Sequence, residues 1–227
     1  MKIYAFIPTR SSLLKPVTEQ LVTYLCSADI EVKLLINEKS IFEAYENAFK
    51  SINPEPDDII IYCHDDIDII MQPEQFREEL IKGLSKTRAG FVGPAGCSRL
   101  DKPCVWWQPE NKRKGFIFHG PSRAEMFPTP YGKLDAEVLV LDGVFLATKA
   151  STLKQISMKK PTQFKGEWDF YDLELTIRAW EAGLSNYVVP IIMRHESSGE
   201  LVGRDSWHQN RTVYMNLHMF PLEVRDG

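Results

Sequence analysis

Residues 59–68 read IIIYCHDDID, an apolar run that ends in a cluster of acidic residues. Five nearly all-apolar positions in a row, at residues 59–63, are typical of a strand that is buried on both faces of a parallel sheet. Ligands of open α/β sheets bind beyond the carboxyl ends of the strands, and the acids follow such an end. The sequence therefore predicts a central strand with a charged site at its carboxyl end.

Strand and helix patterns alternate on both sides of this run. Helix patterns begin near Pro16, which suits a first helical turn, and after Ser40, and a third carries Phe76, Leu80 and Leu84. The alternation predicts an α/β fold with an open, mixed and mostly parallel sheet flanked by helices. The remaining predicted elements are strands at residues 2–7, 32–36, 90–93, 137–141, 144–148 and 187–193, and a helix from near Asp172 to Gly183.

The length and charge of the chain narrow its class. We expect one catalytic domain over residues 1–227, with a nucleotide-binding half at 1–93 and an acceptor-binding half at 94–227, where residues 94–136 are irregular. A net charge of −4, from 27 Lys and Arg against 31 Asp and Glu, disfavours binding to nucleic acid or an anionic membrane. The first apolar run is too short for a signal peptide, and no stretch approaches the roughly 20 apolar residues of a membrane span. The chain should therefore be soluble and cytoplasmic, with reduced cysteines.

The acids after the central strand predict a metal site. In an extended segment, residues two apart face the same way, so Asp66 and Asp68 can converge on one cation while Asp65 points elsewhere. Two carboxylates leave room in the shell of Mg²⁺ or Mn²⁺ for diphosphate oxygens and water. The alternative is an acidic turn that merely stays in water.

Three segments together resemble the GT-A fold glycosyltransferases. They are the D-x-D motif after an early strand, the run VLVLDGVFLA at residues 138–147, and WDFYDLEL at 168–175 followed by RAWEAG at 178–183. Their order and spacing cover most of the chain and are reminiscent of small bacterial and large-algal-virus glycosyltransferases that decorate surface glycans. The resemblance implies transfer of a sugar from a nucleotide-diphosphate donor, most commonly a UDP-sugar, to a glycan or other hydroxyl acceptor.

The resemblance also implies donor-side roles. Pro8, Thr9 and Arg10 after the first strand, and Asn37 after the second, would border the base and ribose. Asp66 would contact ribose or metal and Asp68 the metal, with His195, which follows the last predicted strand, as a third protein ligand. The alternatives are ordinary: Thr9 can cap a helix entry, Asn37 can be a turn residue, and Arg10 and His195 can be solvated loop residues.

On the acceptor side, the resemblance places a carboxylate at the start of the helix that ends near Gly183. Asp172 matches that position, with Asp169 and Glu174 as alternatives, although either aspartate can be a helix cap. Asp142 interrupts an apolar strand, where a carboxylate needs a partner or a catalytic role. The alternative is that Asp142 and Gly143 mark a β-bulge or tight turn. A base would give inversion at the anomeric carbon, and a positioning group would fit retention; the motifs allow both.

Two adjacent tryptophans and several alternative functions remain to be considered. Trp106 and Trp107 suit the face of a sugar ring and suit core packing equally well. A catalytically inactive nucleotide-sugar-binding or carbohydrate-binding module would keep the same fold. A D-x-D phosphohydrolase would need its acids on the first strand, and a sugar-nucleotide pyrophosphorylase would need a glycine-rich loop after that strand; residues 2–12, KIYAFIPTRSS, carry neither.

Overall fold

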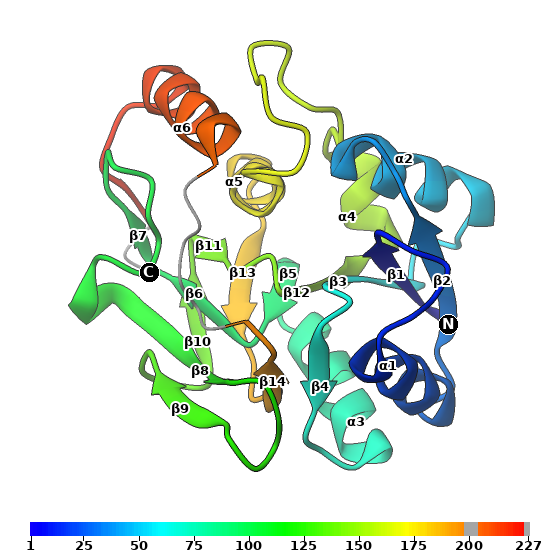
Figure 1. Ribbon diagram of the computed structural model, residues 1–227. Helices are drawn as coiled ribbons and strands as arrows, with labels where there is room; N and C mark the ends of the chain where they lie inside the picture. The colour runs from blue at the N-terminus through cyan, green and yellow to red at the C-terminus, as the bar shows by residue number, and fades with distance from the viewer. Residues whose placement is uncertain (198–203, 225–227) are drawn as a thin grey trace.

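The computed structural model describes residues 1–197 and 204–224 and centres on a seven-stranded sheet (Figure 1). Three neighbouring pairs in it are parallel and three are antiparallel. The predicted open, mixed sheet is confirmed, with a larger antiparallel share than the sequence indicated. Its strands lie in the order β10 (Ala136–Val138), β13 (Ser185–Val188), β5 (Ala89–Gly93), β12 (Phe145–Lys149), β3 (Ile59–Cys63), β1 (Ile3–Thr9) and β2 (Glu31–Ile36).

Helices cover both faces of this sheet, as the alternating pattern predicts (Figure 1). One face packs against α1 (Pro16–Ser27) and α3 (Pro73–Leu84), both of which begin with proline in the first turn. The opposite face packs against α2 (Ile41–Ile52), α4 (Ala150–Gln155) and α5 (Tyr171–Glu181). The last helix of the described chain, α6 (Asp205–Leu217), lies beyond α5.

A second sheet arises where two predicted strands break in the middle. The strand expected at residues 137–141 leaves the main sheet after β10, and Leu139 N–H already donates to Cys97 O. The strand expected at 187–193 is divided by Pro190, which cannot donate to a ladder. The second sheet has the order β11 (Val140–Leu141), β6 (Ala95–Cys97), β8 (Arg113–His119), β14 (Met193–His195) and β4 (Ile67–Ile69), with β9 (Phe127–Pro130) beside β8.

Short elements complete the second half of the chain. A 3₁₀ turn (Glu110–Lys112) precedes β8, and a two-stranded ladder joins β7 (Arg99–Leu100) to β15 (Leu222–Glu223) near the end of the described chain. Because β12 lies between β3 and β5 and β13 lies beside β5, the two predicted halves share one sheet.

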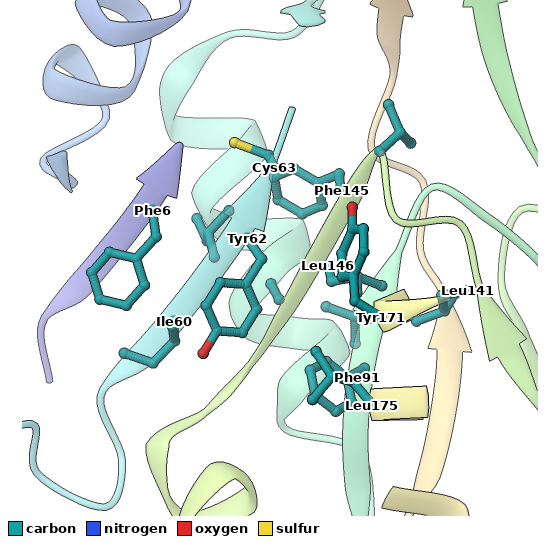
Figure 2. Close-up of a cluster of buried hydrophobic side chains, with 14 of the residues drawn as sticks. Phe6, Ile60, Tyr62, Cys63, Phe91, Leu141, Phe145, Leu146, Tyr171 and Leu175 are labelled. Carbon is teal, nitrogen blue, oxygen red and sulfur yellow. The ribbon is translucent and has the colours of Figure 1, made fainter. Parts of the chain in front are cut away.

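The core lies between the main sheet and the helices on both of its faces. Figure 2 shows side chains of β1, β3, β5 and β12 together with those of α5. Every residue of β3 is buried, as its apolar run predicts. Tyr62 stacks on Tyr45 of α2 with a centroid distance of 4.1 Å, and Tyr45 meets the ring of Tyr171 edge-on at 5.8 Å. These contacts bring the start of α5 close to the end of β3.

The helices of the described residues are short relative to a lipid bilayer. No helix within residues 1–197 and 204–224 combines the length and the apolar character that a membrane crossing requires.

Candidate functional site

Three side chains gather where β3 ends and the second sheet begins. His64 follows β3, Asp66 lies in the turn before β4, and His195 is the last residue of β14. The antiparallel ladder of β4 and β14 pairs Ile67 with His195, and Glu196 N–H donates to Asp66 O at 2.9 Å. His195 Nε2 therefore lies 3.2 Å from Asp66 Oδ1, and His64 Nδ1 lies 3.8 Å from the same oxygen.

Electrostatics favours an ionised carboxylate between two imidazoles. Burial raises the pKa of Asp66, but the close approach and charge of the His195 imidazole outweigh burial and lower that pKa to about 2. Burial, with the charge of His195, lowers the pKa of His64 to about 4, so this ring is neutral at pH 7. For His195, burial is opposed by the close approach and charge of the Asp66 carboxylate, and its pKa is raised.

The donor set fits a divalent cation. One ligand atom from each of His64, Asp66 and His195 lies within 4.8 Å of the others, a grouping suited to a metal ion among the described residues. Asp66 Oδ1 is buried and accepts no hydrogen bond of normal geometry from the described residues, so a cation would satisfy this oxygen. Two imidazoles and one carboxylate favour Mn²⁺ over Mg²⁺, which prefers oxygen ligands throughout.

Asp68 faces a different environment from Asp66. Its two carboxylate oxygens accept from Arg123 Nε and Nη2 at 2.7 Å each, and Arg194 Nε lies 3.6 Å away. Asp68 and Arg194 are paired in the ladder of β4 and β14 and are almost fully buried. They border an open groove of about 1190 Å³ along α1. The structure thus brings Asp66 and His195 together, as the sequence predicts, but does not bring Asp68 into their cluster.

A hydrogen-bonded chain leads from His64 to Asp172. The Tyr171 hydroxyl donates its proton to Gly143 O at 2.7 Å. His64 Nε2 lies 3.1 Å from the same hydroxyl oxygen, so Nε2–H is the donor and the Tyr171 oxygen the acceptor. This tautomer leaves the lone pair of His64 on Nδ1, the nitrogen on the side of Asp66. On the other side of the same residue, Gly143 N–H donates to Asp172 Oδ2 at 3.1 Å. One glycine therefore connects the candidate metal ligands with the predicted base.

Asp172 and Asp142 lie close enough to influence each other. Burial, followed by the negative charge of Asp142, raises the pKa of Asp172 to about 7. Burial also raises the pKa of Asp142, whose Oδ1 accepts from Val144 N–H at 3.1 Å. Two carboxylates with raised pKa values beside a candidate metal site are the arrangement that acid–base chemistry requires near neutral pH.

The other two acids near α5 have partners of their own. Asp169 is buried, accepts from Ser206 Oγ at 2.8 Å and pairs with Arg204, so it attaches the start of α6 to the start of α5. Glu174 pairs with Arg178 one turn along α5. The helix-cap alternative is not observed for either aspartate, because Phe170 occupies the N-cap position and no side chain caps the helix.

The predicted donor-binding residues lie at adjacent strand ends. The parallel pairing of β1 and β2 places Pro8 beside Leu35, and Asn37 N–H donates to Thr9 O at 2.8 Å. Thr9 is buried, Arg10 is exposed, and Asn37 adopts a left-handed φ of 54° that suits asparagine. Because β1 also pairs in parallel with β3, these residues share an edge of the sheet with His64.

The sequence comparison agrees with this geometry. The model of the Glycosyltransferase like family matches residues 24–214, most of the chain. The chain belongs to this family. The matched region of this glycosyltransferase-like chain includes Asp66, Asp172 and His195. No curated protein sequence matches the chain.

The chain is similar to solved structures at low sequence identity. GalNAc-T7 with UDP, GalNAc and Mn²⁺ aligns with a TM-score of 0.52 and 12% identity over 86% of this chain and 44% of that one. The chain thus spans less than half the length of GalNAc-T7. A197 from STIV aligns with a TM-score of 0.46 and 17% identity over 84% of this chain and 82% of that one. The GT-A fold expected from the sequence is confirmed, and the family match supports a glycosyltransferase.

The sequence reading missed His64. The available signal was the spacing His64-x-Asp66, which places an imidazole where a D-x-D motif has its first acid. An extended backbone through Asp68 would place Asp66 and Asp68, rather than His64 and Asp66, at one cation. The chain instead turns at Asp65 and Asp66, so Asp66 precedes β4 and does not alternate with Asp68 along one strand.

We expect Mn²⁺ binding to depend on Asp66 and not on Asp68. Asp66→Ala should weaken Mn²⁺ binding by about a hundredfold or more, because it removes the only carboxylate of the cluster. Asp68→Asn keeps the shape of its side chain and should leave the dissociation constant within about threefold. Isothermal titration calorimetry on folded variants measures both. Loss of Mn²⁺ binding in Asp68→Asn alone would return Asp68 to the ligand set.

Tyr171 should act on the metal through His64. Tyr171→Phe removes the acceptor for His64 Nε2–H, so we expect about tenfold weaker Mn²⁺ binding with the fold retained. Tyr214→Phe is the matched control, since its buried hydroxyl has no hydrogen-bond partner within residues 1–197 and 204–224. Equal Mn²⁺ affinities of the two variants in calorimetry would show that the Tyr171 hydroxyl does not orient the imidazole.

Proposed function

We propose that this chain is a metal-dependent glycosyltransferase that moves a sugar from a nucleotide-diphosphate donor to the hydroxyl of a glycan or another acceptor. The observation that carries the proposal is the position of Gly143, whose C=O is connected through Tyr171 to His64 and whose N–H holds Asp172. A candidate metal cluster and a carboxylate with a raised pKa thus lie on either side of one residue. A donor sugar between them would have its leaving group near the first and its acceptor near the second.

On the donor side, His64, Asp66 and His195 would hold Mn²⁺. When bound, the cation would neutralise charge on the diphosphate, both in the bound donor and as the leaving group. The three residues contribute one negative charge, so a cation held there keeps a net positive charge toward an anionic ligand. GalNAc-T7, which shares the fold, was crystallised with UDP and Mn²⁺.

On the acceptor side, Asp172 would take the proton of the attacking hydroxyl. In this step the acceptor oxygen bonds to the anomeric carbon, the bond from that carbon to the diphosphate breaks, and the proton moves to Asp172. Gly143 N–H donates to Asp172 Oδ2 at 3.1 Å and so holds the carboxylate in place. A base in this role gives inversion at the anomeric carbon, and NMR of the product's anomeric proton tests that outcome.

The nucleotide would lie along the edge formed by the ends of β1, β2 and β3. Thr9 is the last residue of β1, Arg10 follows it, and Asn37 follows β2. The buried Thr9 and the left-handed Asn37 are joined by a main-chain hydrogen bond. We propose a uridine base here, because the fold neighbour GalNAc-T7 holds UDP.

Donor binding should be selective for uridine and require metal. With Mn²⁺ present, UDP should raise the melting temperature more than ATP does, because ATP presents phosphates without the matching base. Differential scanning fluorimetry with each nucleotide, with and without EDTA, measures this. Equal shifts for the two nucleotides would indicate a general phosphate site, and UDP binding with no sugar transfer to any acceptor would indicate a binding module.

Asp172→Asn should lower kcat by about a hundredfold or more while UDP binding stays unchanged, because amide nitrogen cannot accept the proton. In the wild type, kcat/KM should rise tenfold per pH unit below the Asp172 pKa of about 7 and level off above it. A stopped or coupled transfer assay across pH 5–9 measures the profile. Normal turnover of Asp172→Asn would move the role to Asp142 or Asp169.

The same substitution provides a check independent of activity. The folded protein holds the Asp172 proton up to about pH 7, whereas an unperturbed aspartate loses it near 3.8. The free energy of unfolding therefore falls as the pH rises between these values. Asp172→Asn should be more stable than wild type at pH 8, by about 1 kcal/mol after allowance for the partial exposure of the side chain. Equal melting temperatures at pH 8 would contradict the raised pKa.

A further inference from the structure

A small hollow opens beside Asp172 and is otherwise lined by apolar and aromatic side chains. Its volume is about 40 Å³. The aromatic residues come from the irregular segment before β8 and from the starts of α5 and α6, so segments far apart in the sequence form one wall. The lining residues are Cys104, Trp106, Trp107, Phe170, Leu173 and Trp207, with Asp172 as the only carboxylate.

The rings around the hollow are held in place by other rings. Trp106 is buried and meets Tyr131 edge-on at a centroid distance of 5.1 Å. Trp107 packs edge-on against Trp106 at 5.7 Å and stays partly exposed. On the other side, Trp207 packs on Phe170 at 5.4 Å and also stays partly exposed. Trp106 is thus core cover, while Trp107 and Trp207 present surface beside Asp172.

Size and polarity limit what this hollow can accept. A volume of about 40 Å³ is little more than the share of one water molecule in the liquid. It admits a single hydroxyl or hydroxymethyl group, whereas a whole pyranose ring would have to remain at the mouth. Partly exposed indole rings there suit the C–H face of a sugar, which is apolar, while the carboxylate suits a hydroxyl.

We propose that this hollow is the acceptor subsite and that the acceptor is a carbohydrate. One sugar ring packs on Trp107 and Trp207 at the mouth, and one of its hydroxyls enters the hollow to reach Asp172. This inference rests on the proposed transferase function and adds the class of acceptor and the residues that select it. A flexible Ser or Thr peptide or a lipid alcohol gains little from two rigid indole faces and is not the preferred acceptor.

The Asp169 contacts explain how the second wall is built. Asp169 pairs with Arg204 and accepts from Ser206, the residues immediately before Trp207. Arg211, one turn further along α6, stacks its guanidinium over the Trp207 ring at 5.1 Å. Asp169 is therefore a positioning residue for the acceptor wall, which gives the predicted catalytic carboxylate a different task.

The test compares tryptophan variants with Mn²⁺, a UDP-sugar panel and three acceptor probes: methyl glycosides, a Ser/Thr peptide and octanol. We expect transfer to a methyl glycoside, with acceptor KM raised about tenfold or more in Trp207→Ala and Trp107→Ala. The UDP-induced shift in melting temperature should persist in both variants. Trp207→Phe should recover most of the affinity, because it restores an aromatic face. Trp180→Ala, at the opposite end of α5, is the control for loss of a half-buried tryptophan and should leave KM within about twofold.

The outcomes separate the two proposals. Unchanged acceptor KM in both alanine variants of an active enzyme would overturn the acceptor subsite, as would transfer to the peptide or to octanol alone. If Trp207→Ala misfolds, Trp207→Phe is compared with Trp107→Ala. An acceptor KM equal to wild type in Trp207→Phe supports stacking. An acceptor KM in Trp207→Phe as poor as that of folded Trp107→Ala overturns it. Absence of UDP binding and of any transfer by the wild type would instead remove the proposed function itself.

Discussion

The residue on which the site depends is Gly143, between Asp142 and the start of β12. Its carbonyl accepts from the Tyr171 hydroxyl and its N–H donates to Asp172, so one residue fixes the beginning of α5 in two directions. A Cβ at this position would lie 2.5 Å from the Tyr171 hydroxyl oxygen and 3.0 Å from Asp172 Cβ. Glycine is required here because a larger residue would push α5 away from the sheet and separate Asp172 from His64.

The two faces of β4 and β14 divide the charges of the site. On one side, Asp66 lies between the imidazoles of His64 and His195, where a carboxylate oxygen is buried without a hydrogen-bond partner. On the other side, Asp68 accepts two hydrogen bonds from Arg123 and forms an ion pair with Arg194. A buried carboxylate needs a partner, and the ladder gives each acid a different kind: guanidinium groups for Asp68 and a place suited to a cation for Asp66. Neighbouring acids in the sequence thus have distinct roles.

Sequence patterns predicted the elements better than their connections. The buried strand β3 lies at the residues its apolar run indicated, and α1 begins at the proline expected to start it. The segments at 137–141 and 187–193 were expected to be single strands, yet each divides between two sheets. Hydrophobic patterns report burial, and both sheets bury these residues, so the pattern contains no information about the partner strand.

The sequence by itself determined the class of fold, the position of an acidic site at the end of β3, and the family resemblance that points to Asp66, Asp172 and His195. These depend on local order along the chain. Only the tertiary structure decided that His64 joins Asp66, that Asp68 pairs with Arg123, and that Trp107 and Trp207 flank Asp172. Each of these contacts joins segments that are separated by a turn or by many residues. The direction of a side chain there depends on where the backbone turns and on which strands and helices pack together, and neither is written in local periodicity.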